Sequence, residues 1–279
     1  MKRVITDSMI WKFKQYLYSD EKSDNTVQKY LRDVRKFWGF AGSEEIHKAK
    51  LLEFKDFLAE NYKISSANSI IAALNAFLHF MDWEDCCIKP FKVQKKIFCS
   101  EAKELTRAEY IRLVRTAKQK GNERLDLILQ TICGTGIRVS ELRFITVEAV
   151  CRGEAVVSLK NKTRTVFIVR ELQKRLLKYI KKQGITTGSI FITKFGNPVN
   201  RCNIWREMKT LCEQARVSPD KVFPHNLRHL FARTFYGIEK DIAKLADLLG
   251  HSNIETTRIY IITTGAEHKR KMENMRLII

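Results

Sequence analysis

The chain has 279 residues, a length that accommodates about two domains and a substantial buried core. Apolar residues make up 44% of it, which excludes a chain that is disordered by composition. The formal net charge is +20, from 51 lysines and arginines against 31 acidic residues, so a polyanion such as nucleic acid is the favoured partner. A basic surface kept for solubility stays open as the alternative. An anionic membrane is disfavoured, because the basic residues form no juxtamembrane block.

Cysteine usage and hydropathy indicate a reduced, cytosolic setting. The seven cysteines are odd in number and contain no Cys-x-x-Cys pair. No apolar run approaches the length of a membrane span, and the Met-Lys-Arg start is not followed by an apolar signal core. We therefore predict a cytoplasmic protein that is not associated with a membrane.

The first ninety residues carry helical patterns. Apolar residues between 27 and 38 follow the i, i+3, i+4, i+7 spacing of one helix face, and a second stripe runs from 70 to 81. Weaker patterns over 7–18 and 48–61 complete a predicted four-helix bundle, residues 1–90. Four basic residues lie largely off the first stripe and are candidates for contacts with phosphates: Lys29, Arg32, Arg35 and Lys36.

The helical pattern stops at Pro90, and the basic, aperiodic segment 91–103 is interpreted as an interdomain linker. Three linker lysines are further candidates for phosphate contacts: Lys92, Lys95 and Lys96. Thr106 and Glu109 then form the pattern of a capping box, which opens a second domain over 104–279.

The second domain is predicted to be mainly helical with a small β-sheet. After helices at about 107–119 and 122–133, the β-rich runs 155–159 and 165–169 flank the basic turn Lys160-Asn161-Lys162-Thr163-Arg164, which predicts a hairpin. Arg164 in this turn is another candidate for a phosphate contact. The remaining predictions are a strand at 189–192 and helices at about 171–183, 201–216, 225–236, 240–249 and 254–260, with a short helix after Gly265.

A histidine and an arginine open one of these helices. His225 and Arg228 follow Pro224 and are three residues apart, so they share one face of a first helical turn, where an anion is favoured. His229 adds a histidine pair at i, i+4. A metalloprotease motif requires Glu directly after the first histidine, however, and Asn226 stands there. Metal binding is therefore disfavoured.

Three other residues could take part in catalysis, but each also has an ordinary structural explanation. Arg138 follows a Gly-Thr-Gly turn, and Glu141 is placed one helical turn later to orient it; on a surface helix they would be a simple ion pair. The turn is not a Walker A loop. His251 follows a Leu-Leu-Gly helix end and Tyr260 lies nine residues later. Taken singly, these two side chains are equally consistent with capping and packing.

Taken together, these residues resemble the tyrosine recombinase (phage integrase) family in type, order and spacing. The resemblance rests on Thr-Gly-Ile-Arg138-Val-Ser-Glu-Leu, His225-Asn-Leu-Arg228, Leu-Gly-His251 and Tyr260. It implies an α+β catalytic domain over about 104–279, with a C-terminal tail that docks on a neighbouring subunit. The first domain, with Thr26-x-x-x-Tyr30, looks like the helical, SAM-like core-binding domain of that family. Because these helices start near Met1, Xer-like or mobile-element integrases are favoured over those with an arm-binding domain.

The resemblance also implies roles for the phosphate site. Tyr260 would be the nucleophile and would form a covalent 3′-phosphotyrosyl link. Arg138 and Arg228 would hold the non-bridging oxygens, because a guanidinium binds two oxygens at once and stays charged. Glu141 matches the acidic residue that supports the first arginine.

Proton transfer is implied for other side chains. His225 would exchange a proton with the nucleophile, and His251 would donate a hydrogen bond to the phosphate. A hairpin lysine would protonate the departing 5′-oxygen. This hairpin is shorter than the Gly-Lys-Gly-x-Lys-x-Arg turn common in the family. Lys160 matches the first lysine of that turn and is favoured, with Lys162 as the alternative.

The implied reaction requires no metal and no other cofactor. Its partners would be two duplex DNA sites bound by a tetramer that exchanges strands through a Holliday junction, with a partner recombinase or accessory proteins as further candidates. Three alternatives stay open: a non-catalytic architectural DNA-binding protein on the same fold, a type IB topoisomerase, and a metal-dependent transposase or nuclease. The first two share the basic charge, and the topoisomerase shares the tyrosine chemistry.

Overall fold

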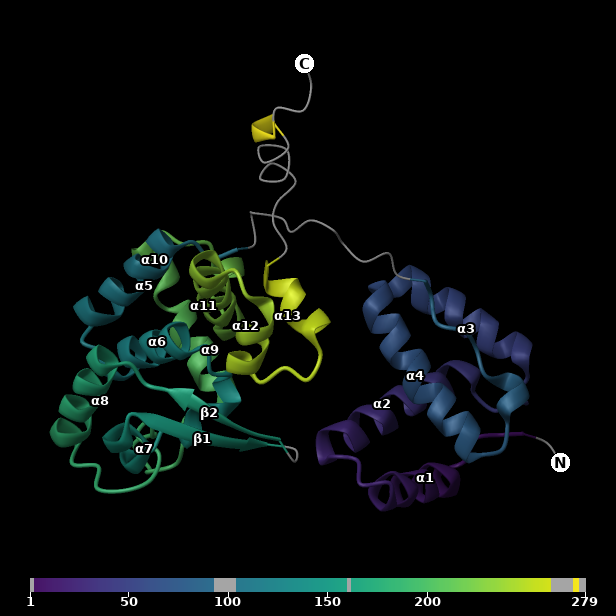
Figure 1. The fold of residues 1–279 in the computed structure, drawn as a ribbon. Coiled ribbons are helices and arrows are strands. Elements are labelled where there is room, and N and C mark those ends of the chain that lie inside the picture. Colours follow the sequence, from purple (N-terminus) through teal and green to yellow (C-terminus); the bar gives the residue numbers. More distant parts are fainter. Residues whose placement is uncertain (1–2, 93–103, 160–161, 262–272, 276–279) are drawn as a thin grey trace. The chain divides into compact units, whose positions relative to one another are not determined.

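The structure is a computed structural model in which the chain divides into two compact units, Met1–Lys95 and Lys96–Ile279 (Figure 1). It describes residues 3–92, 104–159, 162–261 and 273–275. Within these stretches, no helix combines the length and the apolar character needed to cross a lipid bilayer. Most of the predicted linker, with Lys95 and Lys96, lies outside the described residues, as do Lys160 and most of the C-terminal tail.

The first unit is a bundle of helices around one apolar core. Its helices are α1 (Asp7–Ser19), α2 (Asp24–Ala41), α3 (Lys48–Asn61) and α4 (Ile64–Phe80), followed by the 3-10 helix η1 (Glu84–Cys86). The apolar stripe of α2 is buried as its spacing predicts, from Val27 to Phe37, and it packs mainly against α4. The four helices predicted from the sequence are thus confirmed.

The second unit is helical, with one small sheet (Figure 1). Its elements are α5 (Arg107–Gln119), α6 (Glu123–Thr135), η3 (Val139–Phe144), α7 (Val147–Arg152), β1 (Glu154–Leu159), β2 (Lys162–Phe167), α8 (Arg170–Gln183), α9 (Arg201–Lys209), α10 (Cys212–Ala215), η4 (Pro219–Lys221), α11 (Pro224–Glu239), α12 (Ile242–Leu249) and α13 (Ile254–Ile261). The capping box at Thr106 is confirmed, since its hydroxyl accepts from the Glu109 N–H and the Glu109 carboxylate accepts from the Thr106 N–H.

The hairpin differs from its prediction in where the second strand starts. Strands β1 and β2 are antiparallel, with Leu159 opposite Lys162 and Val157 opposite Arg164. Thr163 and Arg164 therefore belong to a strand and not to a five-residue turn. Pairing begins directly after residues 160–161, so that more backbone groups enter the ladder. As a result Arg164 shares a face of the sheet with the buried Val166, because side chains alternate along a strand.

Two other segments were predicted incorrectly. Residues 189–192 form no strand, only the isolated bridges Thr146–Ser189 and Ile192–Pro198. The helix expected over 201–216 is divided into α9 and α10. In both segments the apolar residues pack into the main core of the unit. Several backbone conformations could bury these residues, and the local sequence pattern does not specify which one occurs.

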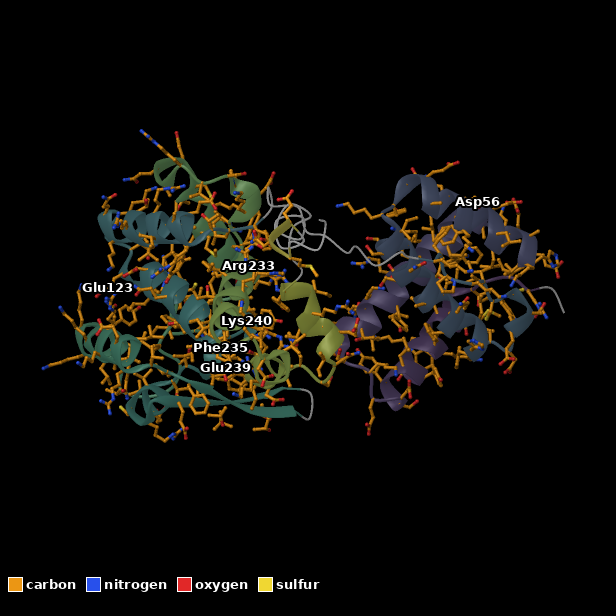
Figure 2. All side chains as sticks on the ribbon, turned by 45° about the horizontal axis from the view of Figure 1, so that its top comes forward. Asp56, Glu123, Arg233, Phe235, Glu239 and Lys240 are labelled. Carbon is orange, nitrogen blue, oxygen red and sulfur yellow. The ribbon has the colours of Figure 1, made fainter. Side chains whose placement is uncertain are left out.

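Three helices at the end of the second unit surround the candidate site. Helices α11, α12 and α13 lie side by side, and α11 also packs along α6 (Figure 1). The second half of α11, marked in Figure 2 by Arg233, Phe235 and Glu239, is held by an ion pair of Arg233 with Glu104 and by Phe235. Phe235 packs against a small cluster that contains Tyr260 and is distinct from the main core of the unit.

Candidate active site

Arg138 is fixed by Glu141 at the start of η3. Helix α6 ends at Gly136, whose φ of +65° is left-handed, so the chain turns and places Arg138 at the N-cap of η3. The Glu141 carboxylate accepts from the Arg138 backbone N–H at 2.9 Å and from its Nη1 at 2.8 Å. The Arg138 side chain remains 39% exposed, so part of its guanidinium is open to a ligand.

Glu141 holds a second arginine from the hairpin. Its carboxylate lies 2.6 Å from Nη2 of Arg164, whose Nη1 donates to the backbone oxygen of Leu248 in α12. Burial acts to raise the pKa of the Glu141 carboxyl, but the bonds from Arg138 and the charge of Arg164 outweigh it and lower that pKa below its ordinary value. Arg164 therefore joins the hairpin, η3 and α12, and only 11% of its side chain is exposed.

The contact between Arg164 and Gly250 gives a prediction on stability. Gly250 ends α12 with φ +64°, and a Cβ there would overlap the Arg164 side chain. We expect Gly250→Ala to lower the free energy of unfolding by about 1–2 kcal/mol for the left-handed backbone and by roughly 1–3 kcal/mol more for the clash. Gly184→Ala is the matched control, because Gly184 ends α8 with the same φ and has no atom within 4 Å of a new Cβ. Equal shifts in the urea midpoint of the two variants would contradict this account.

Arg228 is buried at the centre of the site. It is 2% exposed; its Nη1 donates to the oxygen of Gly136, and its Nη2 donates to the oxygen of Leu249 at 2.7 Å and lies 3.0 Å from Nε2 of His251. Its Nε has no hydrogen-bond partner among the described residues. Burial, and then the charge of Arg138, lower the pKa of the guanidinium to about 10, so it remains charged at neutral pH.

Tyr260 lies among three imidazole rings. The tyrosine is 5% exposed, and its ring centroid lies 4.2 Å from that of His229, 5.4 Å from that of His225 and 5.5 Å from that of His251. Its side chain also acts to raise the pKa of the Arg228 guanidinium, against the larger lowering by burial. The second unit therefore brings together the residues that the sequence motifs singled out: Tyr260, Arg138, Arg228, His225 and His251.

The pKa of each of the three histidines near Tyr260 is lowered, which favours the neutral ring at pH 7. Burial lowers the pKa of the His225 ring, and the charges of Arg228, Arg138 and Arg201 lower it further. Burial, and then the charge of Arg228, lower the pKa of His251 to about 4. Burial, and then the charge of His225, lower the pKa of His229 to about 4. A neutral imidazole next to a tyrosine can accept its proton, which is the requirement for a general base.

The hairpin lysines are placed only in part. Lys160 lies outside the described residues, and Lys162 stands in β2 opposite Leu159, two positions before Arg164. Arg164 itself was predicted to contact phosphate from an open turn, but it points inward to Glu141. This pairing could not be predicted from local patterns, because it depends on a strand register that brings together residues 23 positions apart.

The basic candidates in the first unit fall into two groups. Arg32, Arg35 and Lys92 are exposed. Lys29 instead binds the buried Asp33 at 2.7 Å, and Lys36 donates to the Tyr62 hydroxyl at 2.8 Å. The exposed residues can thus meet a polyanion, although Nε of Arg32 also lies 3.6 Å from Oδ1 of Asp33. Lys29 and Lys36 also hold the bundle together.

Two residues near Tyr260 had not been assigned a role from the sequence. His229 packs on the Tyr260 ring, and the buried Thr257 lies with its hydroxyl 2.8 Å from Nδ1 of His251. The i, i+4 spacing of the histidines suggested a metal. Among the residues that the structure describes, however, no group of three or more His, Cys, Asp or Glu side chains is arranged to hold one.

Comparisons with known proteins cover both units. The model of the phage integrase family matches residues 103–266, and that of the phage integrase N-terminal SAM-like domain matches residues 10–85. A tyrosine recombinase XerA of Thermococcus kodakarensis is 30% identical over 98% of this chain and 96% of its own length. A tyrosine recombinase XerC of Lacticaseibacillus casei is 28% identical over 93% of this chain and 95% of its own length.

Solved structures share the fold. A lambda integrase dimer bound to a COC′ core site has a TM-score of 0.76 at 17% identity, covering 93% of this chain and 96% of that chain. The XerH site-specific recombinase in a post-cleavage complex with a palindromic difH substrate has a TM-score of 0.73 at 17% identity, covering 89% and 78%. The Tn1549 transposon integrase in complex with transposon right end DNA has a TM-score of 0.73 at 17% identity, covering 97% and 99%.

Proposed function

The chain belongs to the phage integrase family and is a site-specific tyrosine recombinase, and from this premise we propose that Tyr260 cuts and rejoins DNA at the site described above. The observation that carries the proposal is the position of the Tyr260 ring against those of His225 and His251, with the buried Arg228 guanidinium 3.0 Å from Nε2 of His251. A nucleophile, a fixed cation and a base within one small cluster are the parts that attack on a phosphodiester requires.

In the first step the Tyr260 oxygen bonds to phosphorus, and the bond from phosphorus to the 5′-oxygen breaks. Tyr260 loses its proton to His225, and the hairpin lysine gives a proton to the departing 5′-oxygen. The products are a 3′-phosphotyrosyl link and a free 5′-hydroxyl. Because the covalent link conserves the phosphodiester, the 5′-hydroxyl of another strand can reverse the step and join a new partner.

Arg138 and Arg228 hold the non-bridging oxygens while charge builds on them. Arg228 is supported for this role by its burial and by an Nε that has no partner among the described residues, and Arg138 by its half-open guanidinium on the Glu141 carboxylate. A guanidinium fixed in advance stabilises the transition state without reorganising during the reaction. His251 gives the phosphate a further hydrogen bond from Nε2.

We assign the general acid to Lys160. We expect Lys160→Ala to lower cleavage of a normal duplex by about 10²–10⁴-fold, the contribution of a general acid, while DNA binding persists. Lys162→Ala is the matched control from the same hairpin and should cleave within a few-fold of wild type. A substrate whose 5′-bridging oxygen is replaced by sulfur should rescue Lys160→Ala, because a thiolate leaves without a proton. Rescue of Lys162→Ala alone would move the role to Lys162.

The two units have different roles on the DNA. We propose that residues 1–90 bind the core site through exposed basic residues such as Arg32 and Arg35, that 91–103 link the units, and that 104–279 catalyse. Two duplexes are held by a tetramer whose C-terminal tails dock on neighbouring subunits, and strands exchange through a Holliday junction. The lambda integrase, XerH and Tn1549 integrase structures contain DNA, which supports duplex DNA as the substrate of this cytoplasmic enzyme.

The proposal is tested with a library of randomised duplexes that carry a nick, so that the cut fragment diffuses away and cleavage is trapped. The protein is incubated with the library in EDTA and washed with SDS, and the retained DNA is sequenced. Retention of one preferred sequence is the expected result. DNA that binds but is never retained would instead favour an architectural protein. Relaxation of a supercoiled plasmid without joining of two sites would favour a topoisomerase.

A further inference from the structure

Thr257 is a buried polar residue on the helix of the nucleophile. It has 0% exposure and lies in α13, three residues before Tyr260, so both side chains belong to the same side of that helix. Its Oγ1 lies 2.8 Å from Nδ1 of His251, in the loop between α12 and α13. A buried hydroxyl requires a hydrogen-bond partner, and His251 is that partner.

The other side of the His251 ring determines the direction of this bond. Nε2 lies 3.0 Å from Nη2 of Arg228, and a guanidinium has donors but no acceptor. Nε2 must therefore carry the lone pair. In a neutral ring the single proton is then on Nδ1, and the Thr257 oxygen accepts it. In this arrangement His251 accepts at Nε2, the atom from which it is proposed to donate to the phosphate.

The hydroxyl of Thr257 can form a hydrogen bond with Nδ1 in both tautomers of the His251 ring, as the acceptor in one and as the donor in the other. We propose that Thr257 is the positioning residue of His251: its hydroxyl accepts from Nδ1 while Nε2 faces Arg228, and it turns to donate to Nδ1 when Nε2 takes the proton and donates to a phosphate oxygen. The ring holds one proton in each state, because the Nδ1 proton is released to water and another is taken up at Nε2. The inference rests on the proposed role of His251 in binding the phosphate.

The same bond couples the histidine to the nucleophile. Thr257 and Tyr260 lie on one short helix, α13, which packs against α11 and α12, so the bond ties His251 to the helix that carries the nucleophile. His251 is thus held in place for the phosphate when Tyr260 is also in place. A carbonyl oxygen at the position of Oγ1 would fix one tautomer, since it can only accept, whereas a hydroxyl permits both.

The test is a double-mutant cycle on a nicked duplex recovered from the library. The variants are Thr257→Val, Thr257→Ser, His251→Ala and the double variant of Thr257→Val with His251→Ala. Thr256→Val is the matched control, because Thr256 is the exposed neighbour on the same helix. Single-turnover cleavage is measured at saturating protein, together with the Kd for the same duplex.

We expect Thr257→Val to slow cleavage by about tenfold at an unchanged Kd, which corresponds to the loss of one hydrogen bond. Thr257→Ser should recover most of the rate, and Thr256→Val should behave as wild type. In the His251→Ala background Thr257→Val should have no further effect, since residues that act as one unit are not additive. In the free protein, the ¹⁵N shifts of the His251 ring should indicate the Nδ1–H tautomer in wild type and in both Thr257 variants, because Arg228 still faces Nε2.

Three results would overturn the inference in different ways. If Thr257→Val slows cleavage by the same factor with and without His251, Thr257 acts through the packing of α13 and not through the histidine. If His251→Ala cleaves at the wild-type rate, the proposed role of His251 in binding the phosphate is wrong and the positioning role fails with it. Wild-type rates in Thr257→Val would also reject the inference, since the hydroxyl would then have no part in cleavage.

Discussion

Tyr260→Phe should form no covalent complex with a nicked duplex, while it binds that duplex as tightly as wild type does. The variant loses one hydroxyl group and keeps the ring that packs with Ala232, Leu245 and Leu249, so the fold should be preserved. Loss of a nucleophile that acts with a base and a phosphate clamp removes nearly all of the reaction, and we expect at least about a 10³-fold decrease in cleavage. The measurement is retention of labelled DNA on the protein after SDS.

The matched control for this prediction is Tyr236→Phe. Tyr236 packs against the same small cluster and also loses only a hydroxyl group, but it lies on α11 away from the phosphate site. It should form the covalent complex at the wild-type rate. Covalent DNA on Tyr260→Phe in amounts similar to wild type would show that another residue attacks the phosphate.

Arg228→Met should lower cleavage by about 10²–10³-fold or more, the effect of removing a fixed donor from a developing oxyanion. The charge that holds the phosphate disappears, and His251 loses the donor that faces its Nε2. The backbone oxygens of Gly136 and Leu249 also lose their donor, so we expect the thermal midpoint to fall as well.

Arg124→Met separates these two effects. Arg124 is a half-buried arginine that also donates to a backbone oxygen, that of Ile192, and to the Glu207 carboxylate. Its Nε has no partner among the described residues either, but it lies at the opposite end of α6 from Arg138. It should lower the thermal midpoint without a comparable loss of cleavage in the protein that remains folded. If the two variants lose the same small amount of activity at equal stability, Arg228 is a structural residue.

The helices of both units follow from their apolar spacing. The stripes in α2 and α4 predicted which faces are buried, because a helix next to one core must hide one face. The Thr106 capping box marked a helix start for a similarly local reason, since both of its bonds join residues three positions apart. Local physics was sufficient for these elements.

Only the active-site residues that belong to sequence motifs could be predicted. The order of Arg138, His225, Arg228, His251 and Tyr260 indicated a phosphate site, and the structure places these side chains around one point. The inward turn of Arg164 and the bond from Thr257 to His251 were not predictable, because both depend on how β2 and α13 lie against α12. Because of the hairpin register, Arg164 lies in a strand and forms an internal ion pair, whereas the sequence pattern had placed it in a solvent-exposed turn.

The most direct test of the account is to identify the atom that becomes attached to DNA. The SDS-stable complex made in EDTA from wild-type protein and a nicked duplex is digested with protease and nuclease, and the modified peptide is sequenced by tandem mass spectrometry. The account predicts a nucleotide joined through its 3′-phosphate to Tyr260, with a free 5′-hydroxyl on the released strand. A 5′-phosphate link, or a nucleotide on any other residue, would contradict it.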